Sequence, residues 1–227
     1  MRFYEHEAKS FLKQWGIPIP RQALSHSAPE AARAAAEMGF PVALKAHVLA
    51  GGRMKAGGVR FASSPQEAQA EAEAILGLAI KGQKPRAVLV EPRAESQGEY
   101  YLGITYDTVT KLPVAIFSDR GGIDIEEVAR ATPERVARRP FSALLPFSDY
   151  QMKELVGSLG VTGPALAAQS GLLSRLAQAV LYHDLLLAEI NPLAKLALDP
   201  SRGSPQGSFL ALDAHIELED EALYRQG

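Results

Sequence analysis

Hydrophobic and polar positions along the chain follow two periods, one typical of helices and one typical of strands. Near the N-terminus, Ala8, Phe11, Leu12 and Trp15 are spaced at i, i+3, i+4 and i+7, so they share one face of a helix. The pattern stops at Gly16, and glycine commonly follows the last turn of a helix. The sequence therefore predicts an amphipathic helix in this segment.

Three further helices are predicted by their start signals. Ser27 and Ser64 are each followed three residues later by glutamate, which is the spacing of a capping box, and these helices should run to Gly39 and Gly77. Ser148 precedes Asp149-Tyr150-Gln151 and is predicted to cap a third helix in the same way. Two more helices are expected over residues 124–130 and 169–183.

Strand-like runs alternate with these helices. They cover residues 41–45, 58–62, 87–91, 100–106, 112–117, 185–190, 193–198 and 209–212. We expect the runs 100–106 and 112–117 to form an antiparallel pair turned at residues 107–111. The polar stretch 199–208, rich in Gly, Pro and Ser, is predicted to be a mobile hairpin loop. A layered α/β or α+β fold follows from this order of elements.

Composition limits the classes of function. The chain has 227 residues, of which 47% are hydrophobic and 22% charged, so it can bury a core of ordinary size. A net charge of −2 gives no electrostatic reason to expect a nucleic-acid or anionic-membrane partner, and no apolar run approaches membrane-spanning length. The absence of cysteine excludes disulfides, thiolate catalysis and cysteine-ligated metals. These features predict a cytoplasmic enzyme or binding protein.

The first candidate for chemistry is Lys45 with the loop that follows it. Lys45 ends an apolar strand run, and the loop Ala50-Gly51-Gly52-Arg53-Met54-Lys55-Ala56-Gly57-Gly58 comes shortly after. Its glycines allow the backbone amides to approach a phosphate, and Arg53 and Lys55 are expected to add charge at the loop tip. The loop is neither a P-loop nor G-x-G-x-x-G. The residues alone leave two interpretations open, a phosphate site or a flexible hairpin with solvated basic side chains.

The second candidate combines residues at strand ends. Glu189 and Asn191 are two positions apart, so they share one face of an extended segment, and Asp213 follows another apolar run. The amide oxygen of Asn191 and the carboxylate of Asp213 are ligands of the kind Mg²⁺ prefers. Glu91 and Glu99 bracket another loop, where a carboxylate could accept hydrogen bonds from a base or ribose. Turn residues and strand-end charges are the alternative interpretation of all five.

The histidines offer no metal-binding or catalytic spacing. None of the five forms H-x-x-x-H or H-E-x-x-H, and we predict that they are surface or packing residues. No serine lies in a G-x-S-x-G context, so nucleophilic hydrolysis has no support.

The chain as a whole resembles the ATP-grasp domain of succinate–CoA ligase β subunits, almost end to end. The resemblance rests on motifs in the same order: Tyr4-Glu5-His6-Glu7-Ala8-Lys9, Val42-Ala43-Leu44-Lys45, the glycine loop through Val59, Leu89-Val90-Glu91, Glu99-Tyr100-Tyr101-Leu102-Gly103, Gly121-Gly122-Ile123-Asp124-Ile125-Glu126, Glu189-Ile190-Asn191-Pro192-Leu193, Leu212-Asp213 and Ala222-Leu223-Tyr224-Arg225-Gln226.

The resemblance implies an α+β ATP-grasp fold with the nucleotide held between two lobes. The expected boundaries are approximately 21–104 for one lobe and 1–20 plus 105–227 for the other. ATP or ADP and Mg²⁺ are the implied nucleotide substrate and metal. The implied nucleotide-binding residues are Lys45, Gly52, Arg53, Met54, Glu91, Ala94 and Glu99.

In the same resemblance Asn191 and Asp213 would hold Mg²⁺. Glu189 would be catalytic, as the carboxylate that meets a phosphohistidine of a partner α subunit. That partner would also carry the CoA site. The implied reaction is succinate + CoA + ATP = succinyl-CoA + ADP + phosphate.

Some positions depart from the family's pattern. Met54 stands where the family usually has glycine, and Ala94 replaces a common threonine, while Pro20 favours an adenine nucleotide. Family β subunits continue into a flavodoxin-like domain, which is expected to be absent here, so the isolated chain is predicted to be inactive. The alternatives are a malate–CoA ligase or ATP-citrate-lyase-like β subunit, or a non-catalytic nucleotide-binding module.

Overall fold

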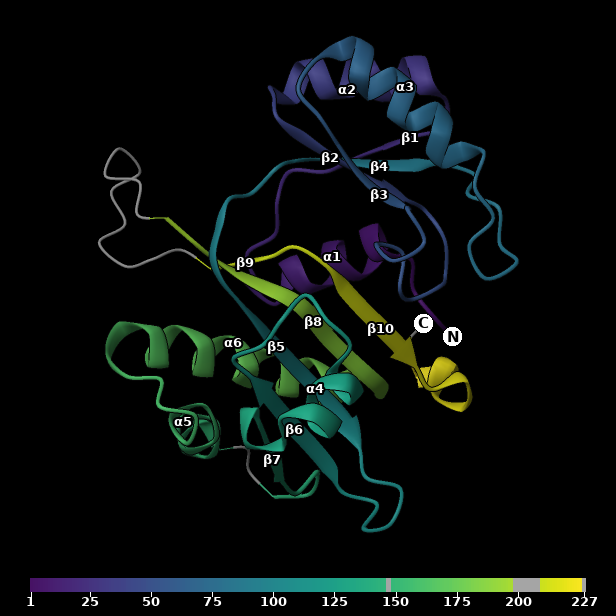
Figure 1. Ribbon diagram of the computed structural model, residues 1–227. Helices are drawn as coiled ribbons and strands as arrows, with labels where there is room; N and C mark the ends of the chain where they lie inside the picture. The colour runs from purple at the N-terminus through teal and green to yellow at the C-terminus, as the bar shows by residue number, and fades with distance from the viewer. Residues whose placement is uncertain (146–147, 198–208, 226–227) are drawn as a thin grey trace. The chain divides into compact units, whose positions relative to one another are not determined.

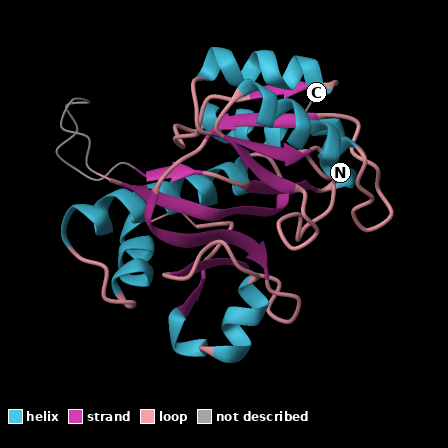
Figure 2. Ribbon diagram, turned by 45° about the horizontal axis from the view of Figure 1, so that its top comes forward, coloured by secondary structure: helices cyan, strands magenta, loops and turns pink. Residues whose placement is uncertain are grey.

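A computed structural model of the protein describes residues 1–145, 148–197 and 209–225 (Figures 1 and 2). The hairpin loop predicted for residues 199–208 lies outside the described residues. The chain forms two compact units. The smaller unit comprises Tyr4–Glu7 and Pro20–Ala94, and the larger comprises Met1–Phe3, Ala8–Ile19 and Glu95–Gly227.

The smaller unit is a four-stranded antiparallel sheet covered on one face by two helices. The strands lie in the order β1 (Ala23–Ser25), β4 (Val88–Pro92), β2 (Val42–Ala46) and β3 (Val59–Ala62). Helices α2 (Ala28–Met38) and α3 (Pro65–Leu76) lie side by side over the sheet (Figure 1). Their alanine-rich faces pack on the side chains of alternate strand residues, including Val42, Leu44, Val88 and Val90.

The predicted capping boxes position both helices. The Ser27 hydroxyl accepts the backbone N–H of Glu30 at 3.4 Å, and the Ser64 hydroxyl accepts that of Glu67 at 3.2 Å. Each glutamate in turn accepts a backbone N–H at 2.7 Å from the residue before the serine. The capping-box prediction is therefore confirmed for α2 and α3.

The larger unit is built on a six-stranded antiparallel sheet. Its strand order is β10 (Ala214–Leu218), β8 (Leu185–Leu196), β5 (Ser96–Tyr106), β6 (Pro113–Ser118) and β7 (Val136–Pro140), and β9 (Phe209–Ala211) also pairs with β8. The antiparallel pair of β5 and β6 confirms the hairpin predicted from the sequence.

Helices cover both faces of this sheet. α5 (Asp149–Gly157) and α6 (Gly163–Tyr182) pack on one face. α1 (Glu5–Gln14) shares their core, although its first residues, through Glu7, belong to the smaller unit. α4 (Ile125–Ala131) lies on the other face, where Ile125 packs against Tyr101 and Ile116 (Figure 1). Two short 3-10 helices, η1 (Pro133–Arg135) and η3 (Asp220–Arg225), complete the described elements.

Three sequence predictions need correction. The runs 185–190 and 193–198 form one strand, β8, because β5 pairs with it on both sides of Pro192, while its other partner changes from β10 to β9. The helix predicted over residues 169–183, α6, begins earlier, at Gly163, because proline suits the first turn of a helix. Ser148 precedes α5, but its hydroxyl makes no capping hydrogen bond.

Candidate functional site

Lys45 lies in a buried cluster of alternating charge in the smaller unit. Its ammonium is 2.8 Å from Glu5 Oε1 and 2.9 Å from Glu91 Oε2. Arg53 forms an ion pair with the other oxygen of Glu5 and donates to the Ala46 carbonyl at 3.2 Å. All four charged side chains are at least nine-tenths buried. Two cations therefore face two carboxylates, and their formal charges cancel.

The register of the sheet explains this cluster. Side chains alternate between the faces of a strand, so Val42, Leu44 and Ala46 face the helices and Lys45 faces the other side. Because Ala43 of β2 pairs with Glu91 of β4, Glu91 is the diagonal neighbour of Lys45 on the same face. The strand pairing thus brings together two predicted site residues that are 46 positions apart (91 − 45) in sequence.

The glycine loop connects β2 to β3 in a compact series of turns. Gly52 has φ +74°, a conformation that favours glycine, and the N–H of Gly58 donates to the Arg53 carbonyl at 2.8 Å. Arg53 points inward and is 8% exposed, so the expectation that it adds charge at the loop tip is wrong. Met54 is 64% exposed and Lys55 is also exposed. Ala94, at the end of the smaller unit, is half-buried after β4.

Two histidines and a tyrosine lie next to the charged cluster in sequence. His47 Nε2 and His6 Nδ1 are 2.9 Å apart, and the ring of Tyr4 stacks on His47 with centroids 4.0 Å apart. Burial, followed by the nearby His6, lowers the pKa of His47 from 6.5 to about 4. His47 is therefore neutral at physiological pH.

In the larger unit, a glycine turn brings Glu99 and Asn191 to one place. The Asn191 amide oxygen accepts the Gly122 N–H at 2.7 Å, and its amide nitrogen donates to the Ile123 carbonyl at 2.8 Å. Gly122 has φ +77°, and a Cβ there would overlap the carboxylate of Glu99. The turn thus fixes the direction of the Asn191 side chain and lies against Glu99.

Asp213 is placed beside Asn191 by the change of partner along β8. The N–H of Asn191 donates to the Asp213 carbonyl at 3.1 Å, and the N–H of Leu212 donates to the Pro192 carbonyl at 3.0 Å. Both Asn191 and Asp213 are half-buried. Their neutral and charged oxygens are the donor types that Mg²⁺ takes from proteins, so these residues fit a magnesium site that keeps several waters.

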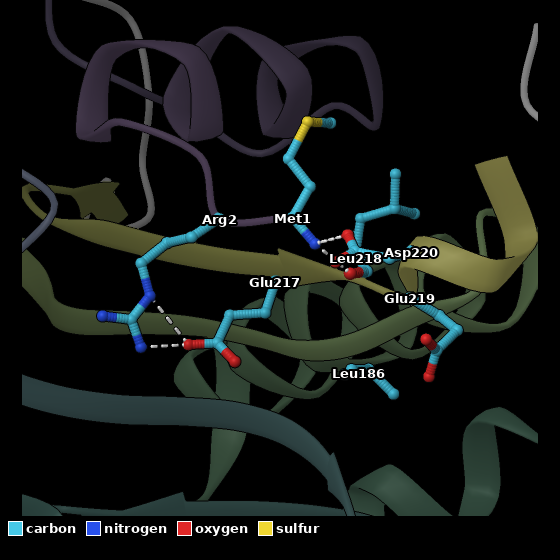
Figure 3. A pocket seen from close by; sticks show the side chains of 7 residues that line it. All are labelled: Met1, Arg2, Leu186, Glu217, Leu218, Glu219 and Asp220. Carbon is cyan, nitrogen blue, oxygen red and sulfur yellow. Dashed lines mark hydrogen bonds and ion pairs between the residues drawn. The ribbon is translucent and has the colours of Figure 1, made fainter.

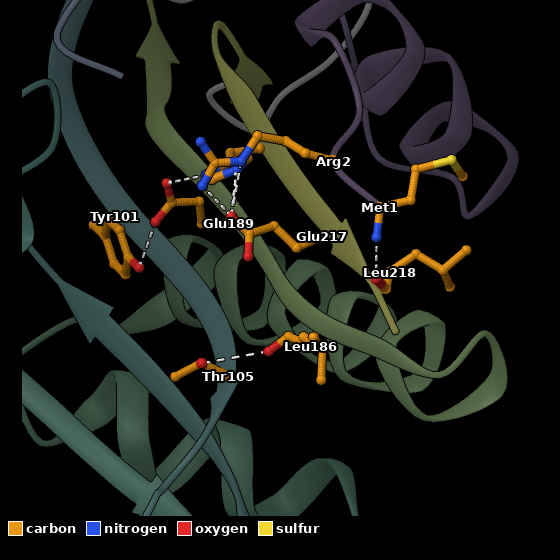
Figure 4. A network of polar contacts seen from close by, with 9 residues as sticks. Met1, Arg2, Tyr101, Thr105, Leu186, Glu189, Glu217 and Leu218 are labelled. Carbon is orange, nitrogen blue, oxygen red and sulfur yellow. Dashed lines mark hydrogen bonds and ion pairs between the residues drawn. The ribbon is translucent and has the colours of Figure 1, made fainter. Parts of the chain in front are cut away.

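Glu189 is held from both of its carboxylate oxygens (Figure 4). The hydroxyl of Tyr101 donates to Oε2 at 2.9 Å, and His215 Nδ1 lies 3.3 Å from Oε1. The other nitrogen of His215 lies 3.1 Å from Glu217, which accepts from Arg2 Nε at 2.9 Å. A line of polar side chains therefore runs from β5 across β8 and β10 to the N-terminal segment.

Burial and the contacts along this line of polar side chains shift the pKa values of Tyr101 and Glu217. Burial, then the charge of Glu189 and its hydrogen bond, raise the pKa of Tyr101 well above its ordinary value, so the phenol stays protonated and donates. Partial burial works to raise the pKa of Glu217, but the hydrogen bond and charge of Arg2 hold it below the ordinary value. Tyr101 therefore stays a hydrogen-bond donor, and Glu217 stays a hydrogen-bond acceptor.

An open cavity of about 210 Å³ lies at the Arg2 end of this line (Figure 3). It is lined by Met1, Arg2, Leu186, Glu217, Leu218, Glu219 and Asp220. The N-terminal ammonium donates to the Leu218 carbonyl at 2.6 Å and forms an ion pair with Asp220. None of the site residues predicted from the sequence lines this cavity. Its lining residues include those that attach the N-terminus to β10.

The structure thus brings the predicted residues together within each unit. Lys45, Arg53 and Glu91 meet in the smaller unit, while Glu99, Asn191 and Asp213 gather around the Gly122 turn of the larger one. Glu5 completes the first cluster but was missed, because no local spacing relates residue 5 to residue 45. Its only signal was its place in the N-terminal motif of the resemblance.

Two kinds of feature are absent from the described residues. No described helix combines the length and apolarity needed to cross a membrane. Within the same residues, His, Asp and Glu side chains form no group of three or more arranged to hold a metal ion.

The chain is similar to known proteins over almost its whole length. Residues 2–195 match the profile of the ATP-grasp domain family. The chain is 39% identical over 226 residues to the β subunit of an ADP-forming succinate–CoA ligase from Herpetosiphon aurantiacus. It is 38% identical over 232 residues to the β subunit of a GDP-forming succinate–CoA ligase from Thermus thermophilus.

These relatives are much longer than the chain. The alignments cover 99% of this chain but only 58% and 57% of the two relatives, so the chain spans little more than half of their length. Among solved structures, an acetyl-coenzyme A synthetase from Candidatus Korarchaeum cryptofilum matches with a TM-score of 0.75 and 22% identity, covering 96% of this chain and 93% of that one. This last likeness establishes the fold.

Proposed function

Because the chain belongs to the ATP-grasp domain family, we propose that it is the nucleotide-binding part of an acyl-CoA synthetase β subunit of the succinate–CoA ligase type. The reaction of the whole enzyme is then succinate + CoA + ATP = succinyl-CoA + ADP + phosphate. The phosphorylated histidine and the CoA site belong to a partner α subunit. This chain contributes the groups that bind the phosphates of the nucleotide, and it contributes the carboxylate of Glu189.

The observation that carries the proposal is the buried Lys45 at the foot of the glycine loop. A fully buried ammonium is costly unless it is paired, and Glu5 and Glu91 supply the pairs. Lys45 is therefore held in one position before any ligand binds. Phosphoryl transfer depends mainly on positioning and charge neutralisation, which a pre-positioned cation provides.

Mg²⁺ is the metal that we propose for the larger unit. Asn191 and Asp213 would hold it, with the Asn191 amide kept in place by the Gly122 and Ile123 backbone. When bound, Mg²⁺ neutralises phosphate charge. The chain itself presents one oxygen each from Asn191 and Asp213, and its backbone keeps the Asn191 amide from rotating.

Glu189 is the residue that we propose to act on the phosphorylated histidine. A carboxylate can accept a hydrogen bond from the imidazole and hold its ring. Tyr101 and His215 keep this carboxylate in a fixed direction, since each contacts a different oxygen. The role of Glu189 is therefore to orient the partner's histidine.

A calorimetric titration of the purified chain with ATP and with GTP, each with and without Mg²⁺, tests the proposal. We expect saturable binding that Mg²⁺ strengthens and that favours ATP, since Pro20 is typical of adenine-specific members. Relatives naming either ADP or GDP are almost equally similar, so identity does not decide the base. If the chain binds neither nucleotide, with or without Mg²⁺, the assignment is wrong.

A further inference from the structure

The smaller unit contains an open cavity of about 350 Å³ that none of the predicted nucleotide-binding residues lines. It is lined by Tyr4, His47, Val48, Gln83, Lys84 and Arg86. Two of these side chains are cationic, and none carries a carboxylate. The cavity therefore differs in charge from the Lys45 cluster, where each cation already faces a carboxylate.

The cationic rim of this cavity is built on an anchored turn. Ile80 and Gln83 exchange two backbone hydrogen bonds of 2.9 Å, across Lys81 and Gly82, which both have positive φ. Ile80 is 1% exposed and fixes the turn to the core of the smaller unit. The Gln83 side-chain oxygen accepts the N–H of Leu49 at 2.9 Å, which ties the turn to the chain leading into the glycine loop.

The aromatic part of the lining is flat and uncharged. The ring of Tyr4 stacks on that of His47 with an interplanar angle of 13°, and His6 holds the other side of His47 at 2.9 Å. Burial lowers the pKa of His47 to about 4, so this ring adds no positive charge at neutral pH. The positive charge of the cavity comes from Lys84 and Arg86.

Hydrogen-bond donors outnumber acceptors in the cavity. Within the described residues, no hydrogen bond or ion pair engages the side chains of Lys84 and Arg86. The Gln83 oxygen is already occupied, so its amide nitrogen is what remains to contact a ligand. The hydroxyl of Tyr4 adds a further donor. A donor-rich site with two cations is suited to an anion with several acceptor oxygens.

We propose that this cavity binds a phosphate group, either free inorganic phosphate or the phosphate of a phosphorylated side chain. A phosphate monoester carries a charge of about −1.5 to −2 at pH 7, which Lys84 and Arg86 together neutralise. The guanidinium of Arg86 can donate two parallel hydrogen bonds to phosphate oxygens. The site does not depend on the proposed nucleotide function, because it uses neither Lys45 nor Glu91.

The test is an NMR titration of the chain at pH 7.5 and constant ionic strength, followed through the ring resonances of the histidines. Three probes are added separately: inorganic phosphate, a neutral peptide carrying one phosphoserine, and acetate. The variants are Lys84→Ala/Arg86→Ala and a matched control, Arg21→Ala/Arg33→Ala, which removes two exposed cations of the same unit.

Phosphate should shift the His47 resonances saturably, with a Kd of about 1 mM, and leave His26 and His183 unchanged. The Lys84→Ala/Arg86→Ala variant should bind at least about tenfold more weakly, and the control should match wild type. Tighter binding of the phosphopeptide than of phosphate assigns the cavity to a phosphorylated side chain, and the reverse order assigns it to free phosphate.

Three results would overturn the proposal. The first is a shift that grows linearly with phosphate and does not saturate. The second is a saturable shift that survives the loss of Lys84 and Arg86, which would place the anion elsewhere, for example at Lys45. The third is acetate binding as tightly as phosphate. If the double variant loses the wild-type His183 resonances, the single variant Arg86→Gln, which keeps hydrogen-bond donors, replaces it and is judged by the same criteria.

Discussion

The buried charged side chains around Lys45 act as one group, not as separate surface charges. Lys45 lies between Glu5 and Glu91, and Arg53 pairs with the second carboxylate oxygen of Glu5. Removing one member of a buried ion pair leaves an uncompensated charge, which costs about 3–5 kcal/mol. Each of these residues therefore matters to the fold as well as to any ligand.

Lys45→Ala should weaken binding of Mg-ATP more than Lys55→Ala, because Lys45 is fixed in the sheet while Lys55 lies on the exposed loop. It should also lower the free energy of unfolding by about 3 kcal/mol, since two buried carboxylates lose their cation. Calorimetry at a temperature where both variants are folded gives the affinities, and urea unfolding gives the stabilities. Equal affinities of the two variants would contradict the assignment of Lys45.

His47 should make the stability of the chain depend on pH below neutrality. Its pKa is about 4 in the folded chain and 6.5 when exposed, so between these values only the unfolded chain binds the proton. The contribution of neutral His47 to the free energy of unfolding is therefore fully present above about pH 6.5, and it is lost as the pH falls toward 4. We expect wild type to lose about 1 kcal/mol more than His47→Gln between pH 7 and pH 4.5, measured by urea unfolding. Identical slopes for the two proteins would show that His47 is not buried as described.

At the scale of elements, similar sequence signals lead to different contacts. Ser27, Ser64 and Ser148 all precede helices, and all are followed by an acidic or amide residue three positions later. The first two accept the expected backbone N–H, but Ser148 does not. A capping serine therefore stabilises the start of α2 and of α3. The start of α5 has no such bond, and this helix is held by the packing of Met152 and Leu155.

Ser64→Ala should therefore destabilise the chain by about 1 kcal/mol, the usual contribution of a capping serine. Ser148→Ala serves as the matched control and should change stability by less than about 0.5 kcal/mol, because no capping bond is lost. Thermal unfolding of both variants measures the difference. A larger loss for Ser148→Ala than for Ser64→Ala would contradict the capping geometry.

The turn at Gly122 makes a second prediction at this scale. Gly122→Ala should cost about 2–3 kcal/mol, since alanine there both adopts φ +77° and overlaps the Glu99 carboxylate. Gly160→Ala is the matched control, because Gly160 has φ +80° but no atom within 4 Å of an added Cβ. That control should cost only about 1 kcal/mol. Urea unfolding that gave equal losses would show that Glu99 moves freely away from the turn.

At the level of the whole molecule, the chain matches little more than half the length of its curated relatives. It spans 58% of the Herpetosiphon aurantiacus relative, whose name identifies it as one subunit of a ligase. Two compact units with separate cores account for the described residues. Binding and turnover therefore need to be tested on different samples.

The 227-residue chain alone should show no CoA-dependent consumption of ATP. The proposed phosphorylated histidine and CoA site belong to the partner, so no acceptor for the phosphoryl group is present. A coupled assay for ADP release, with and without CoA and succinate, checks this. CoA-dependent turnover by the isolated chain would mean that a complete active site lies within it.

The local elements and the family could be predicted from the sequence. Capping serines, glycines at helix ends and the apolar runs of β2, β4, β5 and β6 depend on neighbours a few positions away, so the pattern contains them. The resemblance to the ATP-grasp family rests likewise on ordered local motifs. Lys45, Glu91, Glu189 and Asn191 could be named as candidates because each lies in such a motif.

The contacts between distant residues could not be predicted in this way. Glu5 joins Lys45, and His215 joins Glu189, through contacts between segments that no spacing relates. Arg53 points inward because its ion pair with Glu5 and its hydrogen bond to the Ala46 carbonyl offset the cost of burying its charge. The same holds for β8, which continues through Pro192 because two different strands supply its partners. Pairing over long distances is set by the energy of the whole packed unit, and a local pattern does not contain that information.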